Sequence, residues 1–265
     1  MSLVRKALRS AIVVRAVAFG NPDGSIWGAG LDAGAPVVVA TGGAEPVATA
    51  IAWNADGPEW GLSGDRVALA VSPISEPEHQ AGDDMHDDAH DDAPPSPAVA
   101  GVREPAWAGQ QELCRVTGTV AGAEIDCVGV RTELTQVRSG ELGSVRGFSS
   151  WVSAEEAVTL LALRSESEAH HDRDLVAATV FDPDGWMTSN DPRLSTTYDG
   201  DGNPTRATLE LWIAQGEREF PRRAAGEAAG PAVTVAGEDA TLWVLPLRCH
   251  SRGHDGAGVY LLASV

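Results

Sequence analysis

The chain is built from short apolar segments, rich in valine, isoleucine and tryptophan, that are separated by clusters of glycine, aspartate, asparagine and proline. This pattern is typical of β-strands joined by turns, because β-branched and aromatic side chains suit a pleated sheet, while the intervening residue types favour tight turns. In the first part of the chain the pattern predicts strands at 12–20, 25–33, 36–41, 47–55 and 66–73.

The second part of the chain continues this pattern. LCRVTGTV and AEIDCVGVR flank Ala121 and Gly122 and predict a hairpin. Further strands are predicted in GFSSWVS, AVTLLALRS, DLVAATVFD, RATLELWIA, AVTVAG, TLWVLPLRC and GVYLLASV. VSAEEAVTLLALRSESEA satisfies both the strand and the helix period, so a helix is an open alternative there. We therefore expect an all-β protein, made of barrel or sandwich halves, with at most one or two short helices.

One segment interrupts the strand pattern. Residues 75–105 combine acidic repeats with histidine and proline and contain almost nothing to bury, which predicts a flexible linker. The predicted organisation is an N-terminal β domain or half-barrel at 1–74, this linker at 75–105, and a C-terminal β domain at 106–265.

Composition narrows the functional classes. The 265 residues are 43% hydrophobic and 22% charged, which is ordinary for a folded protein. The net charge of -19 repels phosphate backbones and anionic membrane surfaces, so we expect no nucleic-acid partner. Three cysteines without CxxC spacing argue against a disulfide framework or a zinc ribbon. Arg15 interrupts the first apolar run and no segment is long enough to span a membrane, so a cytoplasmic location is expected.

Two segments have the composition of cation sites. DDMHDDAHDD places two histidines among six aspartates and could bind a metal or a basic partner, but it has no apolar face to hold a rigid shell. DGDGNPTRATLE has the acidic spacing of a calcium loop, yet Pro204 stands where that loop needs glycine, so a hairpin turn is expected. We predict no selective metal site.

Carboxylates inside predicted strands are the more informative candidates. Strand alternation places Glu124 and Asp126 on one face with Val128 and Val130. Glu210 similarly shares a face with Trp212 and Arg206. If such a face lines an apolar cavity, burial would raise the carboxyl pKa and preserve a proton for general acid catalysis. If the face is exposed to solvent, these are ordinary surface residues.

The succession TGTVAGAEIDCVGVR, GFSSWVSAEEAVTLLALRS, HHDRDLVAATVFDPDG, TRATLELWI and GAGVYLL resembles the second half of the carotenoid 1,2-hydratase and AttH-like superfamily, over residues 110–262. The resemblance implies tandem lipocalin-like β-barrels. It also implies acid-base chemistry on isoprenoid or other apolar substrates, with a protonated carboxylic acid in an apolar barrel.

On that resemblance we predict a cofactor-independent lyase or isomerase that encloses an apolar small molecule and starts hydration, cyclisation or isomerisation by protonating a double bond. The predicted catalytic residues are Asp126, Glu210 and Arg131, and the predicted substrate-binding residues are Trp151, Trp212, Arg206 and Glu124. Two alternatives stay open: a noncatalytic carrier of an apolar ligand, and an acidic protein that binds a metal or a partner through residues 79–92.

Overall fold

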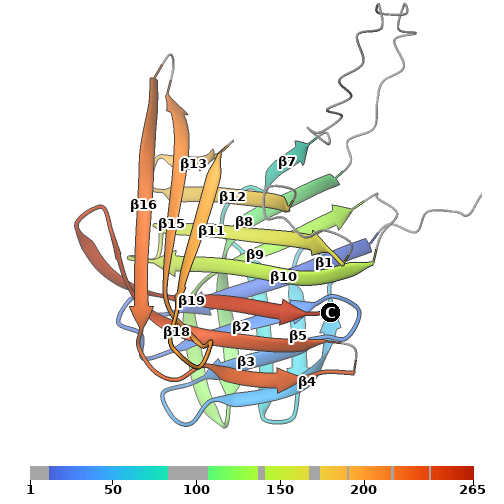
Figure 1. The fold of residues 1–265 in the computed structure, drawn as a ribbon. Coiled ribbons are helices and arrows are strands. Elements are labelled where there is room, and N and C mark those ends of the chain that lie inside the picture. The colour runs from blue at the N-terminus through green and yellow to red at the C-terminus, as the bar shows by residue number, and fades with distance from the viewer. Residues whose placement is uncertain are drawn as a thin grey trace, which may run out of the picture.

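Every regular element in the described part of the chain is a β-strand (Figure 1). The computed structural model describes residues 12–82, 107–136, 141–166, 174–189, 191–215, 218–238 and 240–265. Within them no helix is long and apolar enough to cross a membrane. The predicted all-β class is therefore confirmed.

The first sheet is a closed barrel. Its strand order is β6-β5-β4-β3-β2-β1-β9-β8, a further pairing of β6 with β8 closes the ring, and β7 is added to β8. All pairings are antiparallel, as expected for strands joined by short hairpins. The strands are β1 (Ile12–Gly20), β2 (Trp27–Asp32), β3 (Val37–Thr41), β4 (Val47–Asn54), β5 (Trp60–Gly64), β6 (Val67–Pro73), β7 (Glu78–Gly82), β8 (Trp107–Val120) and β9 (Ala123–Gln136).

Closure of the barrel depends on a glycine where β8 meets β6. Gly118 lies opposite Leu69 and has a φ of +138°, a backbone conformation that side chains rarely adopt. A Cβ atom at this position would lie 2.0 Å from the carbonyl oxygen of Ala68. Glycine is therefore needed both for the backbone angle and for the close approach of the two strands.

The Gly118→Ala variant should be less stable by about 1–3 kcal/mol, the usual cost of holding a residue in a sparsely populated backbone region, with steric contact added. Urea unfolding of the variant and the wild type measures the difference. Gly122→Ala, in the β8–β9 turn, is a useful comparison because its φ is also positive but a Cβ there meets nothing within 4 Å. Equal effects of the two changes would contradict a steric role for Gly118.

The second sheet is curled and open, with the order β13-β12-β11-β10-β19-β18-β16-β15-β14 and with β17 paired to β18. The Ser189 hydroxyl, just after β13, bonds to β15, the strand next to the other edge: it donates to Trp212 O and accepts from Trp212 N, both at 3.0 Å. The strands are β10 (Leu142–Trp151), β11 (Ala157–Ser165), β12 (Leu175–Asp182), β13 (Gly185–Thr188), β14 (Pro192–Tyr198), β15 (Pro204–Gln215), β16 (Arg218–Ala228), β17 (Val233–Ala236), β18 (Thr241–Ser251) and β19 (His254–Ser264).

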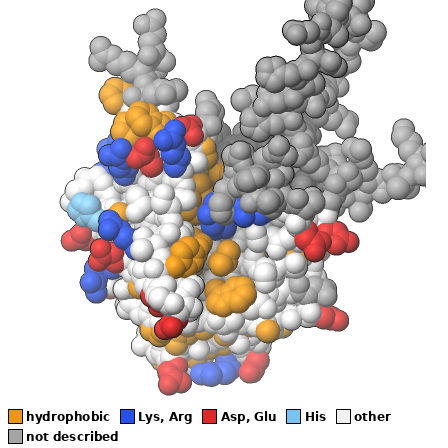
Figure 2. Space-filling model, in the orientation of Figure 1, with side chains coloured by type: hydrophobic (Ala, Val, Ile, Leu, Met, Phe, Trp, Pro, Cys, Tyr) orange, Lys and Arg blue, Asp and Glu red, His pale blue; other side chains and the backbone are white. Residues whose placement is uncertain are grey.

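Three apolar cores follow from these two sheets. One fills the barrel interior and includes Phe19, Leu62 and Val116. A second fills the concave face of the curled sheet, and a third joins the outer wall of the barrel to the back of the second sheet. In Figure 1 the strands β10, β18 and β19 accordingly lie across the barrel. On the face in Figure 2, acidic and basic side chains lie next to one another around apolar patches.

Each predicted strand is found in the structure, but β5, β7, β13, β14 and β16 were not predicted. The segment 12–20 is β1, and the hairpin around Ala121 and Gly122 is β8–β9. The helix alternative for VSAEEAVTLLALRSESEA is wrong, because Ala157–Ser165 is strand β11, paired on both sides by β10 and β12. The sheet topology also differs from the predicted grouping of residues, since β8 and β9 complete the first barrel and do not join the second sheet. Most of the predicted linker lies outside the described residues.

Candidate functional site

One end of the barrel interior carries charged side chains. At this end β1, β5 and β8 begin while β2, β4 and β9 end, so antiparallel pairing brings residues far apart in sequence together. The alternation of β8 and β9 turns Glu112 and Arg131 to the same interior face as Cys114, Val116 and Cys127. We refer to this charged end of the interior as the barrel mouth.

The central feature of the barrel mouth is a buried ion pair. Glu112 and Arg131 lie directly opposite each other on β8 and β9, and Arg131 Nε donates to Glu112 Oε2. Their side chains are only 5% and 6% exposed, respectively. A second donor of the guanidinium, Nη1, bonds to the carbonyl oxygen of Pro58 in the β4–β5 loop. The pair is thus removed from water and fixed at both ends of the guanidinium.

Two indoles complete the wall next to this ion pair. The guanidinium carbon of Arg131 lies 5.0 Å from the centroid of the Trp60 ring, within the range of a cation–π contact. Trp53 packs against Trp60 with ring centroids 5.6 Å apart. Trp53 Nε1 is buried, and no described residue accepts a hydrogen bond from it. A buried N–H without an acceptor is unusual in a folded protein, and it would be satisfied by an oxygen atom of a bound molecule.

A second ion pair lies closer to the rim of the same mouth. Arg15 Nε donates to Glu133 Oε2 at 2.7 Å, and Arg15 Nη1 lies 3.6 Å from Asp32 Oδ2. These side chains are 19–30% exposed, so water reaches them. The Arg15–Glu133 pair at the rim of the barrel mouth is therefore hydrated, whereas the Glu112–Arg131 pair further inside is shielded from water.

The buried pair is a poor way to stabilise a barrel. Removing two charges from water costs several kcal/mol for each ion, and apolar residues of similar volume would do as well or better. Charged groups held in an apolar site are, however, the usual means of orienting a ligand or transferring a proton. The arrangement can therefore present N–H donors, a carboxylate base and aromatic faces to one small molecule.

Buried thiols and a buried phenol also predict an alkaline limit to stability. Burial raises the pKa of Cys127 from 9.0 to about 12, and it likewise raises the pKa of Cys249 to about 12 and that of Tyr260 to about 12. The neutral forms favour the folded state. This stabilisation of the folded state is fully present at a pH below the pKa values that these groups have in the unfolded chain. It is lost as the pH rises towards 12.

We accordingly expect the free energy of unfolding to fall between the unfolded and the folded pKa values, with each group adding a slope of about 1.4 kcal/mol per pH unit. Urea unfolding across this pH range measures the slope. Cys127→Ala should give a smaller slope than the wild type, whatever its effect on stability at neutral pH. An unchanged slope would show that Cys127 titrates normally in the folded protein.

The structure places Asp126 and Glu124 on the outside of the barrel, away from the mouth. The predicted alternation holds, since Val128 and Val130 share the face of Asp126, but that is the outer face, which packs against the second sheet. Asp126 is 55% exposed and bonds to Arg115, and Glu124 is exposed. The hydrogen bond from Arg115 lowers the pKa of Asp126 below its ordinary value. This geometry favours a surface ion pair over a proton donor.

Glu210 is also on an outer face, that of the second sheet, because the alternate residues Leu209 and Leu211 fill the concave core. Arg223 Nε donates to Glu210 Oε2, and Trp212 Nε1 donates to Glu210 Oε1 at 3.0 Å. The hydrogen bond from Arg223 is the main cause that lowers the Glu210 pKa. The neighbouring Arg206 is exposed. Glu210 and Trp212 thus lie on the same face, as predicted, but Glu210 is an ion-paired carboxylate on the outer face of the sheet.

Trp151 occupies a third location. It is fully buried in the core between the barrel and the second sheet, and its Nε1 has no hydrogen-bond partner within the part of the chain that the structure describes. Of the predicted site residues, only Arg131 lies in the barrel interior. The structure therefore does not gather the seven predicted residues into one site.

Glu112, Trp53 and Trp60 are not among the site residues predicted from the sequence. A signal for Glu112 was present in the predicted hairpin. A two-residue turn at Ala121 and Gly122 fixes the register of the hairpin, so residues equally far from the turn lie opposite each other. This register pairs Glu112 with Arg131. Trp60 lies between the predicted strands 47–55 and 66–73, and it is the first residue of β5.

The calcium-like segment is a turn, as expected. Asp199 accepts hydrogen bonds from the backbone N–H groups of Asp201 and Asn203, at 3.0 and 2.8 Å, between β14 and β15. Among the residues that the structure describes, no three histidine, cysteine, aspartate or glutamate side chains form a group that could hold a metal ion. The DDMHDDAHDD segment lies outside those residues.

Comparison with known proteins supports the fold. No known protein family matches the chain, and no curated protein matches it in sequence. A protein assigned as AttH from Nitrosomonas europaea superposes with a TM-score of 0.53 at 9% identity, covering 99% of this chain and 96% of that chain. Kievitone hydratase from Nectria haematococca gives a TM-score of 0.51 at 9% identity, covering 97% and 89%. The predicted resemblance to the carotenoid 1,2-hydratase and AttH-like superfamily is confirmed at the level of the fold.

Proposed function

We propose that the barrel mouth binds an apolar small molecule that carries a carbonyl oxygen, and that the protein adds water to this molecule or removes it. The observation that carries the proposal is the Glu112–Arg131 pair, which is buried on the interior face beside Trp53 and Trp60. The two indoles supply an apolar wall for the body of the molecule. The guanidinium supplies hydrogen-bond donors for its oxygen atom.

The ion pair favours one order of events. Glu112 is paired with a guanidinium, so it begins as a carboxylate and acts first as a base. It takes a proton from water while the water oxygen attacks the far carbon of a double bond conjugated to the carbonyl group. The electron pair moves to the carbonyl oxygen, which Arg131 stabilises. Glu112 then returns the proton to the nearer carbon, so that the net change is the addition of one water molecule.

This order revises the prediction of a proton-initiated reaction. Protonation of an isolated double bond needs a neutral carboxylic acid at the start. The pKa values of Asp126 and Glu210 are both lowered by neighbouring arginines, so each carboxyl group is ionised at neutral pH. An isoprenoid-like body remains compatible with the proposal, because an indole wall accepts any flat or branched apolar group.

The likeness to a hydratase gives the reaction class as an analogy. One of the two similar structures is named as a hydratase that acts on kievitone. Proteins of one fold catalyse many different reactions. The proposed hydration therefore rests on the residues of the barrel mouth, and the similar hydratase is supporting analogy.

The proposal is tested by letting the protein select its own ligand. Wild-type protein is incubated with a cell extract, recovered, and examined by native and denaturing mass spectrometry. We expect a retained apolar molecule, and we expect it in two forms that differ by the mass of one water. Repeating the incubation in ¹⁸O-labelled water should make only the hydrated form heavier. A matched sample of the Glu112→Leu/Arg131→Met variant should retain neither form.

The other outcomes separate the alternatives. A retained molecule that never gains labelled oxygen would show that the protein carries an apolar ligand without hydrating it. Equal retention by the double variant would place the ligand outside the barrel mouth and overturn the proposal.

A further inference from the structure

Three buried polar side chains bond to one another across the core between the barrel and the second sheet. Thr179 Oγ1, on β12 of the second sheet, donates to Gln111 Oε1 on β8 at 2.7 Å. Gln111 Nε2 in turn donates to Thr132 Oγ1 on β9 at 3.2 Å. Each of the three side chains is at most 3% exposed. Because a buried polar group is costly to leave unpaired, these side chains fix one another's positions, and we call them the Gln111 bridge.

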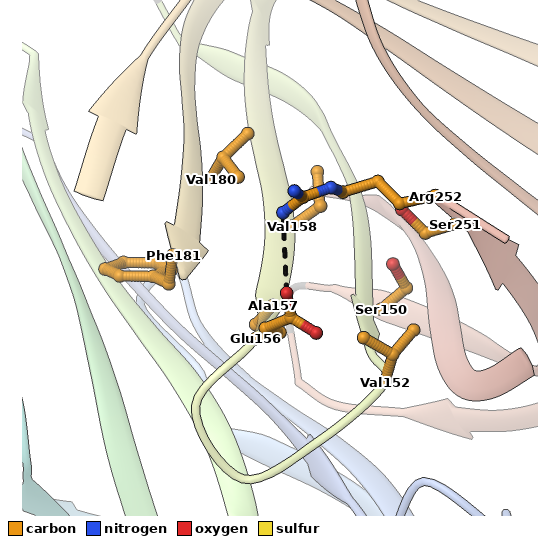
Figure 3. A pocket seen from close by; sticks show the side chains of 9 residues that line it. All are labelled: Ser150, Val152, Glu156, Ala157, Val158, Val180, Phe181, Ser251 and Arg252. Atoms are coloured by element: carbon orange, nitrogen blue, oxygen red, sulfur yellow. Dashed lines mark hydrogen bonds and ion pairs between the residues drawn. The ribbon is translucent and has the colours of Figure 1, made fainter. Parts of the chain in front are cut away.

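Strand alternation turns Thr179 towards the barrel. Figure 3 shows the end of β12 beside a small hollow, with Val180 and Phe181 on opposite sides of the strand. Val180 belongs to the concave core of the second sheet, whereas Phe181 belongs to the core against the barrel. Thr179 stands two residues before Phe181 and therefore shares its side. The bond from Thr179 to Gln111 thus ties the second sheet to the wall of the barrel.

The Gln111 bridge lies directly behind the ion pair of the barrel mouth. Gln111 and Thr132 are opposite residues on β8 and β9, and Glu112 and Arg131 are the next opposite pair. Successive residues of a strand point to opposite faces, so the first pair points to the second sheet and the second pair into the barrel. A displacement of Gln111 therefore reaches Glu112 through a single peptide unit.

Backbone pairing is interrupted at Glu112 on the side of β8 that faces away from β9. The ladder between β6 and β8 ends at the pair Pro73–Cys114, and the ladder between β7 and β8 ends at the pair Glu78–Gln111. Glu112 belongs to neither ladder. Side-chain bonds of the adjacent residue Gln111 consequently contribute more to the position of this part of β8 than they would inside a continuous ladder.

We propose that the Gln111 bridge positions the Glu112–Arg131 pair, so that the second sheet helps to set the geometry of the barrel mouth. Thr179 and Gln111 are then positioning residues, because they act through Glu112 and touch no bound molecule themselves. Without the bond from Thr179, β8 would open locally at Glu112 more often. The Arg131 guanidinium would then meet water more often, although none of its own bonds had been removed.

The test follows one N–H group of the ion pair in the full-length protein. The Nε–H signal of Arg131 is assigned in NMR spectra through its correlation with the Arg131 backbone, and its rate of hydrogen exchange with water is measured. Thr179→Val replaces the hydroxyl group by a methyl group and should speed the exchange about tenfold, the effect of losing one hydrogen bond that opposes local opening. Thr179→Ser keeps a hydroxyl group and should exchange at nearly the wild-type rate. Gln111→Met changes the bridge from the barrel side and should act like Thr179→Val.

Thr159→Val is the matched control for stability. Thr159 lies opposite Thr179 on β11 and is 2% exposed, but its Oγ1 bonds to Ser149 Oγ within the second sheet, at 2.8 Å. The same substitution at this position should lower the midpoint of urea unfolding to a similar extent and leave the exchange of Arg131 Nε–H unchanged. Wild-type exchange in Thr179→Val or in Gln111→Met, or an equal rise in Thr159→Val, would overturn the proposal.

A second readout rests on the hydration proposed for the barrel mouth. In Thr179→Val the rate of labelled-water incorporation should fall about 10- to 100-fold, the effect of a small misplacement of the proton-transferring group, and Thr179→Ser should keep the wild-type rate. Retention of the molecule should change little in both variants. The two proposals fail separately: a wild-type protein that never incorporates labelled water would remove the role of Glu112 in hydration, whereas the exchange of Arg131 Nε–H alone decides whether the bridge positions the pair.

Discussion

The Arg131→Met variant is expected to lose about 3–5 kcal/mol of unfolding free energy, the cost of breaking a buried ion pair. The substitution removes the cation that pairs with Glu112 but leaves the Glu112 carboxylate, which is 5% exposed, in the barrel interior. It also removes the contact with the Trp60 ring and the hydrogen bond to the Pro58 carbonyl group. Urea unfolding at neutral pH measures the loss.

The double variant Glu112→Leu/Arg131→Met provides the internal control. It removes both charges, so most of the lost stability should return, and the double-mutant cycle should give a large interaction energy between the two positions. Arg115→Met is a matched change at the exposed Arg115–Asp126 pair and should alter stability by about 1 kcal/mol at most. A similarly small effect of Arg131→Met would show that water reaches the Glu112–Arg131 pair.

Glu112→Gln should have the largest effect on activity. Glutamine keeps the shape of the side chain and can still accept a hydrogen bond from Arg131, but it cannot take a proton from water. We therefore expect the rate of labelled-water incorporation into the retained molecule to fall about 100- to 10,000-fold, the usual contribution of a general base. Retention of the molecule itself should change little.

Asp126→Asn is the matched change on the outer face of the barrel, and it should leave the incorporation rate at the wild-type value. A large loss of activity in this variant, together with normal activity in Glu112→Gln, would assign the chemistry to the strand carboxylate first predicted from sequence. Wild-type activity in both variants would exclude both Glu112 and Asp126 as the proton-transferring group.

Strand positions were predictable because the chain alternates short apolar segments with turn residues. The segment at 12–20 matched β1, and Ala121 and Gly122 fixed the register of β8 and β9. The assignment of β8 and β9 to the first barrel was not predictable, because these strands follow a long acidic segment that suggested a boundary between domains. Pairing between β1 and β9 is a long-range event that no local pattern records.

The site was harder to predict for a related reason. Alternation tells which residues share a face but not whether that face is inside a barrel, outside it, or between two sheets. In β9 both faces are largely buried, since Cys127 points into the barrel and Val128 packs against the second sheet. Asp126 and Arg131 therefore seemed equally good candidates, and only the closed barrel separates them.

A crystal structure of the protein with its retained molecule would show whether the barrel mouth is the binding site. We expect density in the barrel mouth, with an oxygen atom of the molecule within hydrogen-bonding distance of the Arg131 guanidinium and its apolar part against Trp53 and Trp60. Density found only elsewhere, with the Glu112–Arg131 pair unchanged and the barrel interior closed, would contradict this expectation.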